Sequence, residues 1–276
     1  MSTADIRQRF TVLVRQSPGD FRLAEGALLI AQEEYPGLDV AHYLQHLDTM
    51  AETIRHTLGL ELDPHHIVAC INAYLFDELG FHGNQEHYYD PRNSFLNDVL
   101  ERKTGIPITL AVIYLDLGRQ VGLPIMGVGL PGHFIVQYMA QTGSFWIDPF
   151  HAGEILTHAA CVARVRQIYG PEAPWHEAYL HSVSDHAILQ RILHNLKAVY
   201  VQQGDYQRAL SAVERLLLLS PEAMTEVRDR GLLHYQLGHF EAALDDLQHY
   251  LQLTPDAPDA MAIHRHVAAL QQHLRR

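Results

Sequence analysis

Helical periodicity dominates the first hundred residues of the chain. From position 40 to 58 apolar residues recur at helical spacing, with Asp39 placed as an N-cap and Gly59 near the helix end. The same arrangement recurs from Asp63 to Gly80, where proline occupies the first helical position. A third, mostly apolar helix precedes them within "FRLAEGALLIAQEE". The pattern therefore predicts a helical N-terminal part.

The middle of the chain changes from helical periodicity to alternation. A polar, aromatic and turn-rich segment at 81–103 leads into "PITLAVIYLDLGRQVG", which predicts a helix with Pro107 in its first turn. "PIMGVGL" predicts a short strand, and "HFIVQYM" with "SFWIDP" predicts a hairpin across the Gly143 turn. These elements predict an α+β fold, in which a helical N-terminal layer carries a small antiparallel sheet.

The last third of the chain contains an internal repeat. "GDYQRALSAVERLLLLSP" and "GHFEAALDDLQHYLQLTP" align at an offset of 34 residues, which is the tetratricopeptide period of two antiparallel helices. We predict a first domain at 1–180 and an all-α domain at 186–276, with two repeats and "DAMAIHRHVAALQQHLRR" as a capping helix. Because 151–185 holds no long Gly/Ser-rich stretch, we expect the repeats to follow the core without a flexible linker.

Composition and charge narrow the classes of function. A chain of 276 residues that is 47% hydrophobic can bury a sizeable core. Its net charge of -12 argues against the basic surface that binds DNA or RNA. No apolar run reaches the roughly 18 residues of a membrane span, and "MSTADIRQRF" lacks the apolar core of a signal peptide. We therefore expect a cytoplasmic protein in which both cysteines, Cys70 and Cys161, are reduced.

The order of elements in 104–150 positions a candidate catalytic pair. His133 lies at the start of one predicted strand and Asp148 ends the next, so the hairpin would bring them together as hydrogen-bonded neighbours. The segment resembles transglutaminase-like and papain-type sites, in which a cysteine at a helix N-terminus is activated by a histidine that an aspartate orients. "GLP" at 122–124 and "FWIDP" add to this resemblance. It places the family nucleophile at Pro107, which has no thiol, hydroxyl or amide N–H.

A wider resemblance covers nearly the whole chain. "LLIAQEEYPGLDV", "YYDPRNSFLNDVLERKTGIPITLAVIY" and "GVGLPGHF", followed by the repeats, resemble the bacterial SirB-type family of transglutaminase-like proteins with tetratricopeptide repeats. The resemblance implies a cytoplasmic bacterial protein without an established reaction. It also makes the Gly-x-Pro-Ile sequence part of the family pattern, so that Pro107 is a family feature.

The candidate catalytic residues also have structural interpretations. Pro107 pre-sets a helix start, which is the ordinary role of proline at that position. His133 and Asp148 are either a residual catalytic dyad or a purely structural hydrogen bond. Thr109 carries a hydroxyl half a turn further along the helix, although threonine without an N-terminal amine is a rare nucleophile.

Two further chemistries are considered and not favoured. Cys70 lies in a predicted helix among apolar residues, where a small buried thiol is the ordinary interpretation. Asp148 and His151 could join His133 as metal ligands. The sequence has 20 histidines but no HExxH, paired CxxC or dense histidine cluster, so we expect neither a metal nor a cofactor.

The polar segment before the core helix supplies candidate ligand contacts, because such loops often build sites. The alternative interpretation is structural, with Asp90–Pro91 as a turn and Asn93 or Ser94 as a helix cap. The residues expected to line a cleft beside the dyad are Pro107, Thr109, Glu33, Asn84, Tyr89 and Asn93.

The repeats are expected to bind a protein or peptide segment. Arg191 and Asn195 resemble half of a carboxylate clamp, but the equivalent positions in the second repeat are Thr225 and Asp229, whose carboxylate would repel the ligand. A mixed apolar and cationic surface suits an amphipathic helix or an internal peptide instead. The alternative is that the capping helix covers this face. The predicted partner-binding residues are Arg191, Asn195, Arg228, Leu232 and Tyr235.

Two functions follow from these residues. The first is a binding or scaffold protein whose transglutaminase-like core lacks the thiol and whose repeats present a partner surface. The second is a hydrolase or acyl transferase that uses His133 and Asp148 with another nucleophile or an activated water. Because Pro107 cannot attack a substrate, the sequence favours the binding protein.

Overall fold

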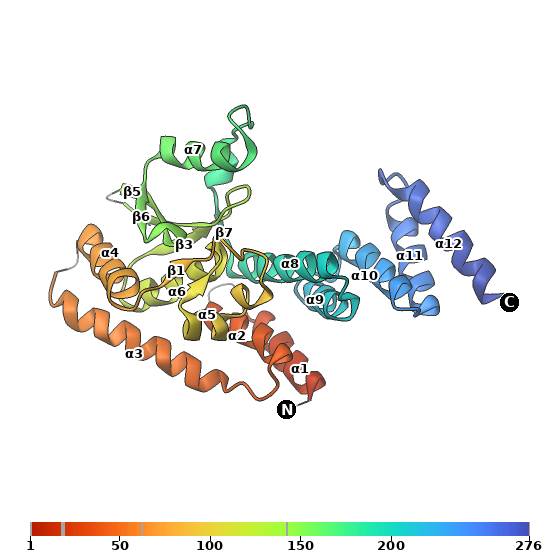
Figure 1. The fold of residues 1–276 in the computed structure, drawn as a ribbon, viewed down its shortest axis with the longest axis horizontal. Helices are drawn as coiled ribbons and strands as arrows, with labels where there is room; N and C mark the ends of the chain where they lie inside the picture. Colours follow the sequence, from red (N-terminus) through yellow and green to blue (C-terminus); the bar gives the residue numbers. More distant parts are fainter. Residues whose placement is uncertain (1, 18–19, 62, 142, 276) are drawn as a thin grey trace. The chain divides into compact units, whose positions relative to one another are not determined.

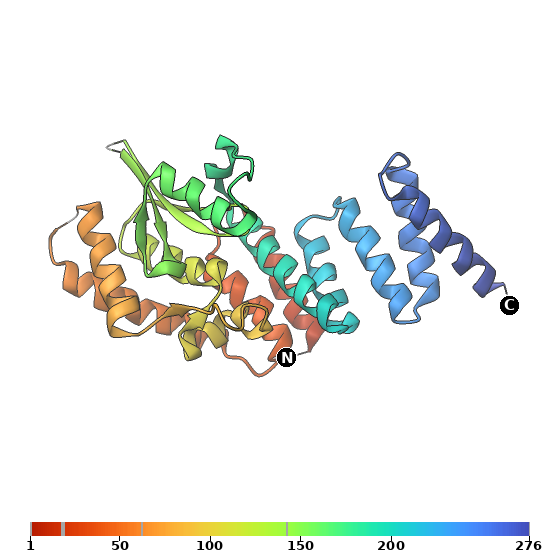
Figure 2. The same cartoon turned by 45° about the horizontal axis from the view of Figure 1, so that its top comes forward.

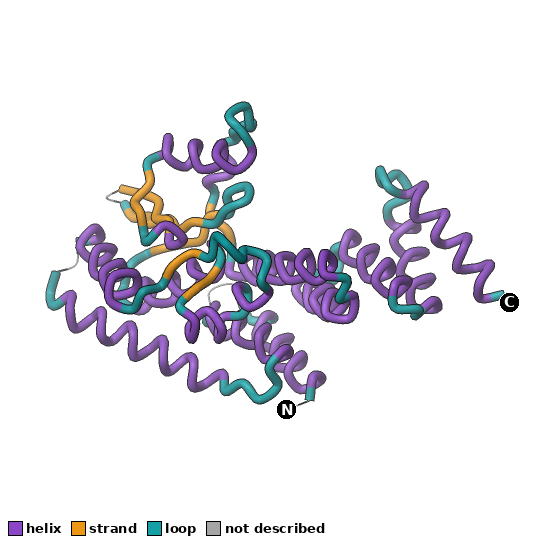
Figure 3. The backbone as a smooth tube through the Cα atoms, viewed as in Figure 1, coloured by secondary structure: helices purple, strands orange, loops and turns teal. Residues whose placement is uncertain are grey.

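The computed structural model divides the chain into two compact units, Met1–Ile192 and Leu193–Arg276 (Figure 1). The strands of the described chain all lie in the first unit, and the described part of the second is helical (Figure 3). The α+β fold predicted from the change of periodicity, followed by helical repeats, is confirmed. The structure describes residues 2–17, 20–61, 63–141 and 143–275.

Four α-helices and a π-helical segment form the N-terminal part of the first unit. Asp39 and Asp63 cap their helices as predicted, since each carboxylate accepts a hydrogen bond from the backbone N–H three residues later. Gly59 follows the long third helix with a φ of 61°, a conformation that favours glycine. The elements are α1 (Thr3–Val14), α2 (Leu23–Glu34), α3 (Val40–Leu58), α4 (Pro64–Asn72) and the π-helix Ala73–Glu78.

The polar segment after these helices folds into short pieces. Its two short strands pair in parallel. The expected helix cap at Asn93 or Ser94 is wrong, because Phe95 occupies the N-cap position and makes no side-chain cap hydrogen bond. The elements are β1 (His82–Gly83), the 3-10 turn Pro91–Asn93, α5 (Leu96–Arg102) and β2 (Thr104–Gly105).

A five-stranded sheet of order β6-β5-β4-β3-β7 lies at the centre of the first unit. Its paired strands are antiparallel, and the predicted hairpin is confirmed by a register that sets Val136 opposite Ile147. The edge strands β6 and β7 were not predicted, because two or three residues are too few for a visible alternation. The strands are β3 (Ile125–Val128), β4 (Ile135–Ala140), β5 (Gly143–Asp148), β6 (Glu154–Leu156) and β7 (Ser182–Val183).

Helices cover both faces of this sheet (Figures 1 and 2). On one face lies α6 (Pro107–Gln120), whose Gly118 leaves room for the side chain of Ile125 on β3. On the other face α7 (His158–Tyr169) buries Cys161. The residues that pack between α7 and the sheet include Val128, Leu130, Ile135, Leu156, Cys161 and Val165. Two 3-10 turns, Pro149–His151 and Glu177–Leu180, complete the unit.

The second unit has the paired helices expected of the repeats. Gly204 and Gly238, which match in the sequence repeat, follow their helices with φ values of 73° and 76°. Leu247 and Ile263 belong to one core cluster, so the expected capping helix packs against the second repeat. None of the described helices is both long and apolar enough to cross a membrane. The helices are α8 (Asp185–Gln203, which contains the boundary between the units), α9 (Tyr206–Leu219), α10 (Met224–Gln236), α11 (Phe240–Leu253) and α12 (Ala260–Leu274).

Candidate functional site

The hairpin brings His133 and Asp148 into contact. His133 Nε2 lies 2.9 Å from Asp148 Oδ2, and the two side chains are 4% and 0% exposed. The predicted hydrogen bond is therefore present. Its placement differs slightly from the expectation, because His133 precedes the first residue of β4 by two positions while Asp148 is the last residue of β5.

Oδ2 of Asp148 has more than one partner. His151 Nδ1 lies 2.8 Å from Oδ2, and Arg164 Nε lies 3.3 Å from it as an ion pair that lacks hydrogen-bond geometry. Burial alone would raise the pKa of Asp148, but its hydrogen bonds from His133 and His151 outweigh this and lower the pKa well below its usual range. Asp148 is therefore a carboxylate at neutral pH.

The ionised carboxylate fixes the tautomer of its partner histidine. Because a carboxylate only accepts hydrogen bonds, Nε2 of His133 carries the proton that it donates to Asp148. The other ring nitrogen, Nδ1, has no hydrogen-bond partner among the described residues. This is the orientation in which an aspartate holds a histidine for work at its second nitrogen.

An aromatic ring connects the dyad with the strands that lead into α6. Phe150 lies edge-on to His133, with ring centroids 5.8 Å apart. Gly83 of β1 packs on the same ring, and β1 pairs with β2, which runs directly into α6. The lack of a side chain at Gly83 permits this approach. The dyad and the strand before the helix start are thus joined through Phe150.

The start of α6 offers no reactive group. Pro107 is the first helical residue and is buried. Thr109 is 1% exposed, and its hydroxyl accepts from the N–H of Ile106 at 3.1 Å and lies 2.7 Å from the carbonyl of Asn93, to which it donates. The Thr109 hydroxyl therefore holds the helix start in place.

Neither cysteine is set up as a nucleophile. Cys70 Sγ lies 3.6 Å from His66 Nε2, and burial together with the charge of Glu61 raises its pKa. Burial followed by the charge of Asp148 raises the pKa of Cys161 to about 11. Both thiols therefore remain protonated at neutral pH, and protonated thiols are poor nucleophiles.

The ligand atoms of His133, Asp148 and His151 all lie within 4.8 Å of one another, which is close enough to surround a metal ion. The guanidinium of Arg164 occupies the neighbourhood of the same carboxylate oxygen. A metal ion there would meet a second positive charge at short range. The residues therefore fit a hydrogen-bonded cluster better than a metal centre.

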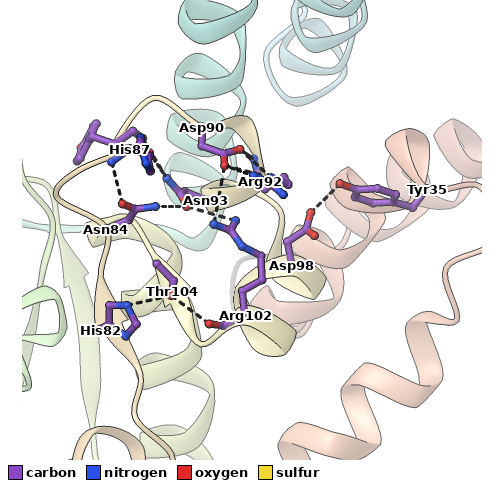
Figure 4. A network of polar contacts seen from close by, with 11 residues as sticks. Tyr35, His82, Asn84, His87, Asp90, Arg92, Asn93, Asp98, Arg102 and Thr104 are labelled. Atoms are coloured by element: carbon purple, nitrogen blue, oxygen red, sulfur yellow. Dashed lines mark hydrogen bonds and ion pairs between the residues drawn. The ribbon is translucent and has the colours of Figure 1, made fainter.

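The polar loop before α5 is organised by Asn93 (Figure 4). Its amide donates to the carbonyls of His87 and Tyr88, at 2.7 and 3.2 Å, and accepts from Asn84 at 3.1 Å. Asn93 is fully buried, so its side chain holds the loop rather than facing a ligand. Tyr89, by contrast, is 63% exposed.

Glu33, which the sequence placed at the cleft, lies near the end of α2. It forms an ion pair with Arg7 at 2.7 Å, between α1 and α2. Its neighbour Tyr35 donates to Asp98 of α5 at 2.7 Å, which ties the end of α2 to the loop network (Figure 4). The structure thus brings His133 and Asp148 together, and places Glu33 in a separate pair.

The predicted partner-binding residues are divided between the two units. Arg191 belongs to the first unit, where its guanidinium donates to the carbonyls of Leu130 and His133 at 3.1 and 2.8 Å. The sequence had placed Arg191 among the partner-binding residues of the repeats, but its side chain is held by the core of the first unit. Asn195 is half-buried at the start of the second unit.

In the second repeat the predicted residues contact their own unit. Arg228 pairs with Asp229 and Asp259 at 2.7 Å each. Leu232 and Tyr235 pack against the core formed by α11 and α12. These contacts cover Leu232 and Tyr235 within the unit, while the ion pairs of Arg228 stay partly exposed.

Sequence reasoning missed the groups that complete the dyad. His151 was considered only as a metal ligand, and its place three residues after Asp148, across a proline turn, was the signal that it returns to the carboxylate. Arg164 on α7 and Phe150 carried no such signal, because only tertiary packing brings them to the site.

The chain matches two family models. The transglutaminase-like superfamily model matches residues 41–194, and a tetratricopeptide repeat model matches residues 196–268. The resemblance to a family with this architecture is therefore confirmed. The bacterial relatives carry the name UPF0162 rather than SirB.

Individual relatives extend over most of the chain. A UPF0162 protein of Xylella fastidiosa is 40% identical over 255 residues, covering 90% of this chain and 89% of the relative. UPF0162 protein PA3419 of Pseudomonas aeruginosa is 29% identical over 96% of each chain. F-box only protein 21 of Pongo abelii is 30% identical over 206 residues, and the match covers 68% of this chain and 31% of that protein. Joined by the family-model matches, these similarities show that the chain belongs to the UPF0162 family within the transglutaminase-like superfamily.

Proposed function

We propose that the core of this protein is a transglutaminase-like binding module without a thiol nucleophile, and that the repeats bind a protein segment. The observation that carries the proposal is Pro107 at the first position of α6, where the family resemblance places the nucleophile. Proline has no group that can attack a carbonyl. A core that keeps the dyad but has proline at this position retains part of the frame of a site without its reacting atom.

The surroundings of Pro107 support a binding role. Thr109 uses its hydroxyl to hold the helix start, and both cysteines have raised pKa values. None of these three groups is available as a substitute nucleophile near the helix start. The hydrogen-bonded cluster around Asp148 therefore serves to hold the site in shape.

The repeats carry a line of charges that suits a polar partner. Lys197 of α8 bonds Asp229 of α10 at 2.8 Å, and Arg228 of α10 bonds Asp259, the N-cap of α12, at 2.7 Å. Both cations already hold carboxylates, so neither is available to clamp a chain-terminal carboxylate. An internal segment with alternating charges matches this line better, because it meets both signs in turn.

The second candidate function is a hydrolase or acyl transferase that activates water. The observation in its favour is the second ring nitrogen of His133, which has no hydrogen-bond partner among the described residues while Asp148 holds the first. Such a nitrogen is where a general base takes a proton from water. The enzyme would then need no side-chain nucleophile.

Ester hydrolysis separates the two functions. The wild-type chain, His133→Gln and a matched control, His56→Gln on the exposed face of α3, are first treated with iodoacetamide and then given p-nitrophenyl acetate. We expect equal rates for the three proteins. A rate for His133→Gln that is roughly a hundredfold below the other two, with its fold intact by circular dichroism, would show general base catalysis and overturn the proposal.

A further inference from the structure

Arg191 is a cation in the first unit without a carboxylate partner. Several other arginines of that unit hold an acid, as Arg22 holds Asp116 and Arg119 holds Asp185. Among the described residues no acid lies within ion-pair distance of Arg191, whose recorded hydrogen bonds both go to backbone carbonyls. A guanidinium stays charged in this environment, so it retains the capacity to attract an anion.

The loop that ends at His133 is shaped around this guanidinium. Nη2 of Arg191 donates to the carbonyls of Leu130 and His133. A side chain at Gly129 would come within 3.0 Å of Nη1, so glycine is what lets the cation lie against the loop. The contacts use Nη2, which leaves Nε and Nη1 without a hydrogen-bond partner among the described residues. Donors on these two nitrogens thus remain for a ligand, but they do not share an edge of the fork, because Nε–H points toward Nη2.

Two tyrosines interact electrostatically with Arg191. A side chain at Gly132 would come within 3.1 Å of the Tyr169 hydroxyl, so that phenol lies over the residue before His133. Burial lowers the pKa of Arg191, while the negative charges that Tyr88 and Tyr169 would carry if ionised oppose this, so both phenols lie within electrostatic range of the guanidinium. Neither hydroxyl has a hydrogen-bond partner among the described residues. A phenol O–H donates to an anion as readily as to a carbonyl.

We propose that Arg191, Tyr88 and Tyr169 form a binding site for an oxyanion, a carboxylate or phosphate group, beside His133. The guanidinium supplies charge and the N–H donors of Nη1, and a charge-assisted hydrogen bond to an oxyanion is stronger than one to a neutral acceptor. The tyrosines supply further donors and flat apolar walls for the body of the ligand. The inference deepens the proposed function, on which it rests, by naming the ligand class of the core.

The site also explains part of the family motif. In "GVGLPGHF", Gly129 admits Arg191, and Gly132 admits Tyr169 with a φ of 67° that favours glycine. The same loop carries His133, whose carbonyl Arg191 holds. An anion bound to Arg191 would therefore sit next to the dyad.

Titration with simple anions tests the inference on the full-length chain. The backbone amides of His133 and Phe134 are followed by 1H–15N NMR as sodium phosphate or sodium acetate replaces sodium chloride at constant ionic strength. Both amides should shift and saturate with at least one anion. Saturation with phosphate alone would assign a phosphate ligand, and saturation with both would assign a general carboxylate or phosphate site.

Matched variants identify the donors. Arg191→Gln should bind more than roughly tenfold more weakly, and Tyr169→Phe and Tyr88→Phe roughly threefold to tenfold more weakly, because each loses a charged or a neutral donor. Arg166→Gln, an exposed cation of α7, is the control and should bind like the wild type. The tyrosine variants keep the test valid if Arg191→Gln fails to fold.

Two results would overturn the inference. One is the absence of saturable shifts with either anion, and the other is an unchanged affinity in both tyrosine variants and in a folded Arg191→Gln. Either result would leave the ester-hydrolysis comparison unaffected, since that comparison depends on His133 alone. The failure of this inference and the failure of the proposed function are therefore distinguishable.

Discussion

A partly buried arginine of the first unit lacks an acid partner among the described residues, whereas a chain of ion pairs in the second unit gives each of its cations one. In the second unit Lys197, Asp229, Arg228 and Asp259 form a chain of ion pairs in which each cation holds an acid. In the first unit Arg191 bonds two backbone carbonyls and lies over the Phe134 ring at 5.5 Å, with no acid partner among the described residues, although the protein carries a net charge of -12. An ion network in which every cation has an acid partner holds its own unit in shape. A cation without an acid partner can still attract an anionic ligand.

The largest expected effect on stability comes from the buried carboxylate of Asp148, which His133, His151 and Arg164 surround in the first unit. Asp148→Ala leaves the donors of His133, His151 and Arg164 without their buried carboxylate, so it should lower the free energy of unfolding by about 3–5 kcal/mol. Urea unfolding followed by tryptophan fluorescence measures this, because both tryptophans, Trp146 and Trp175, lie in the first unit.

The pH dependence of this effect has a definite sign. The pKa of Asp148 is lower in the folded chain than its ordinary value, so the folded state binds fewer protons and the stabilisation is complete above the ordinary value. The stability difference from Asp148→Asn should shrink as the pH falls below roughly 4. Glu52→Gln, an exposed change on α3, is the control, and a difference that grows on acidification would contradict the assignment.

A smaller effect is expected in the ion chain of the repeats. Lys197→Met leaves Glu226 and Asp229 short of a cation and should destabilise the second unit by about 1–3 kcal/mol. Hydrogen-exchange mass spectrometry of peptides from 204–253 would report this as faster exchange. Arg208→Met removes an exposed ion pair and should cost about 0–1 kcal/mol, so equal effects of the two changes would mean that the ion chain is not special.

A change in thiol reactivity is expected at the start of α6. Pro107→Cys places a thiol at the positive end of α6, where the helix dipole lowers the thiol pKa. Iodoacetamide at neutral pH should modify position 107 roughly tenfold faster than Cys161, which is also buried and whose pKa is raised to about 11. Peptide mass spectrometry measures both rates, and a rate at 107 no higher than at Cys161 would show that the helix start does not activate a thiol.

The smallest expected effect concerns the repeats as a binding surface. An acidic peptide and its C-terminally amidated twin should bind the protein with the same affinity, because Lys197 and Arg228 already hold carboxylates. Isothermal titration measures both affinities. Tight binding that is lost on amidation would show a carboxylate clamp, and the closed ion chain would then be the wrong description of this unit.

Local sequence signals predicted the elements and half of the site. Asp63, Pro64 and the repeated glycines fixed helix ends because caps depend on neighbours in sequence, and the hairpin followed from alternation. The pair of His133 and Asp148 followed from that hairpin.

The remaining site residues depend on contacts between distant segments. Arg191 lies 58 residues from the carbonyl it holds, and its repeat-like surroundings in sequence indicated the wrong unit. Arg164 reaches Asp148 from α7. This helix follows β6, an edge strand that is too short to predict from the sequence. Such contacts leave no periodic trace in the sequence.

The central claim is that the core keeps the frame of a transglutaminase-like site without its nucleophile. Intact mass spectrometry after incubation with an activated acyl ester tests it most directly, with wild type and Pro107→Cys side by side and surface lysine acylation subtracted through a Pro107→Ser, His133→Gln control. We expect no specific acyl adduct on the wild type and one on Pro107→Cys, mapped to position 107. A stoichiometric adduct on the wild type that disappears in His133→Gln would contradict the claim, because it would reveal a nucleophile that the core already has.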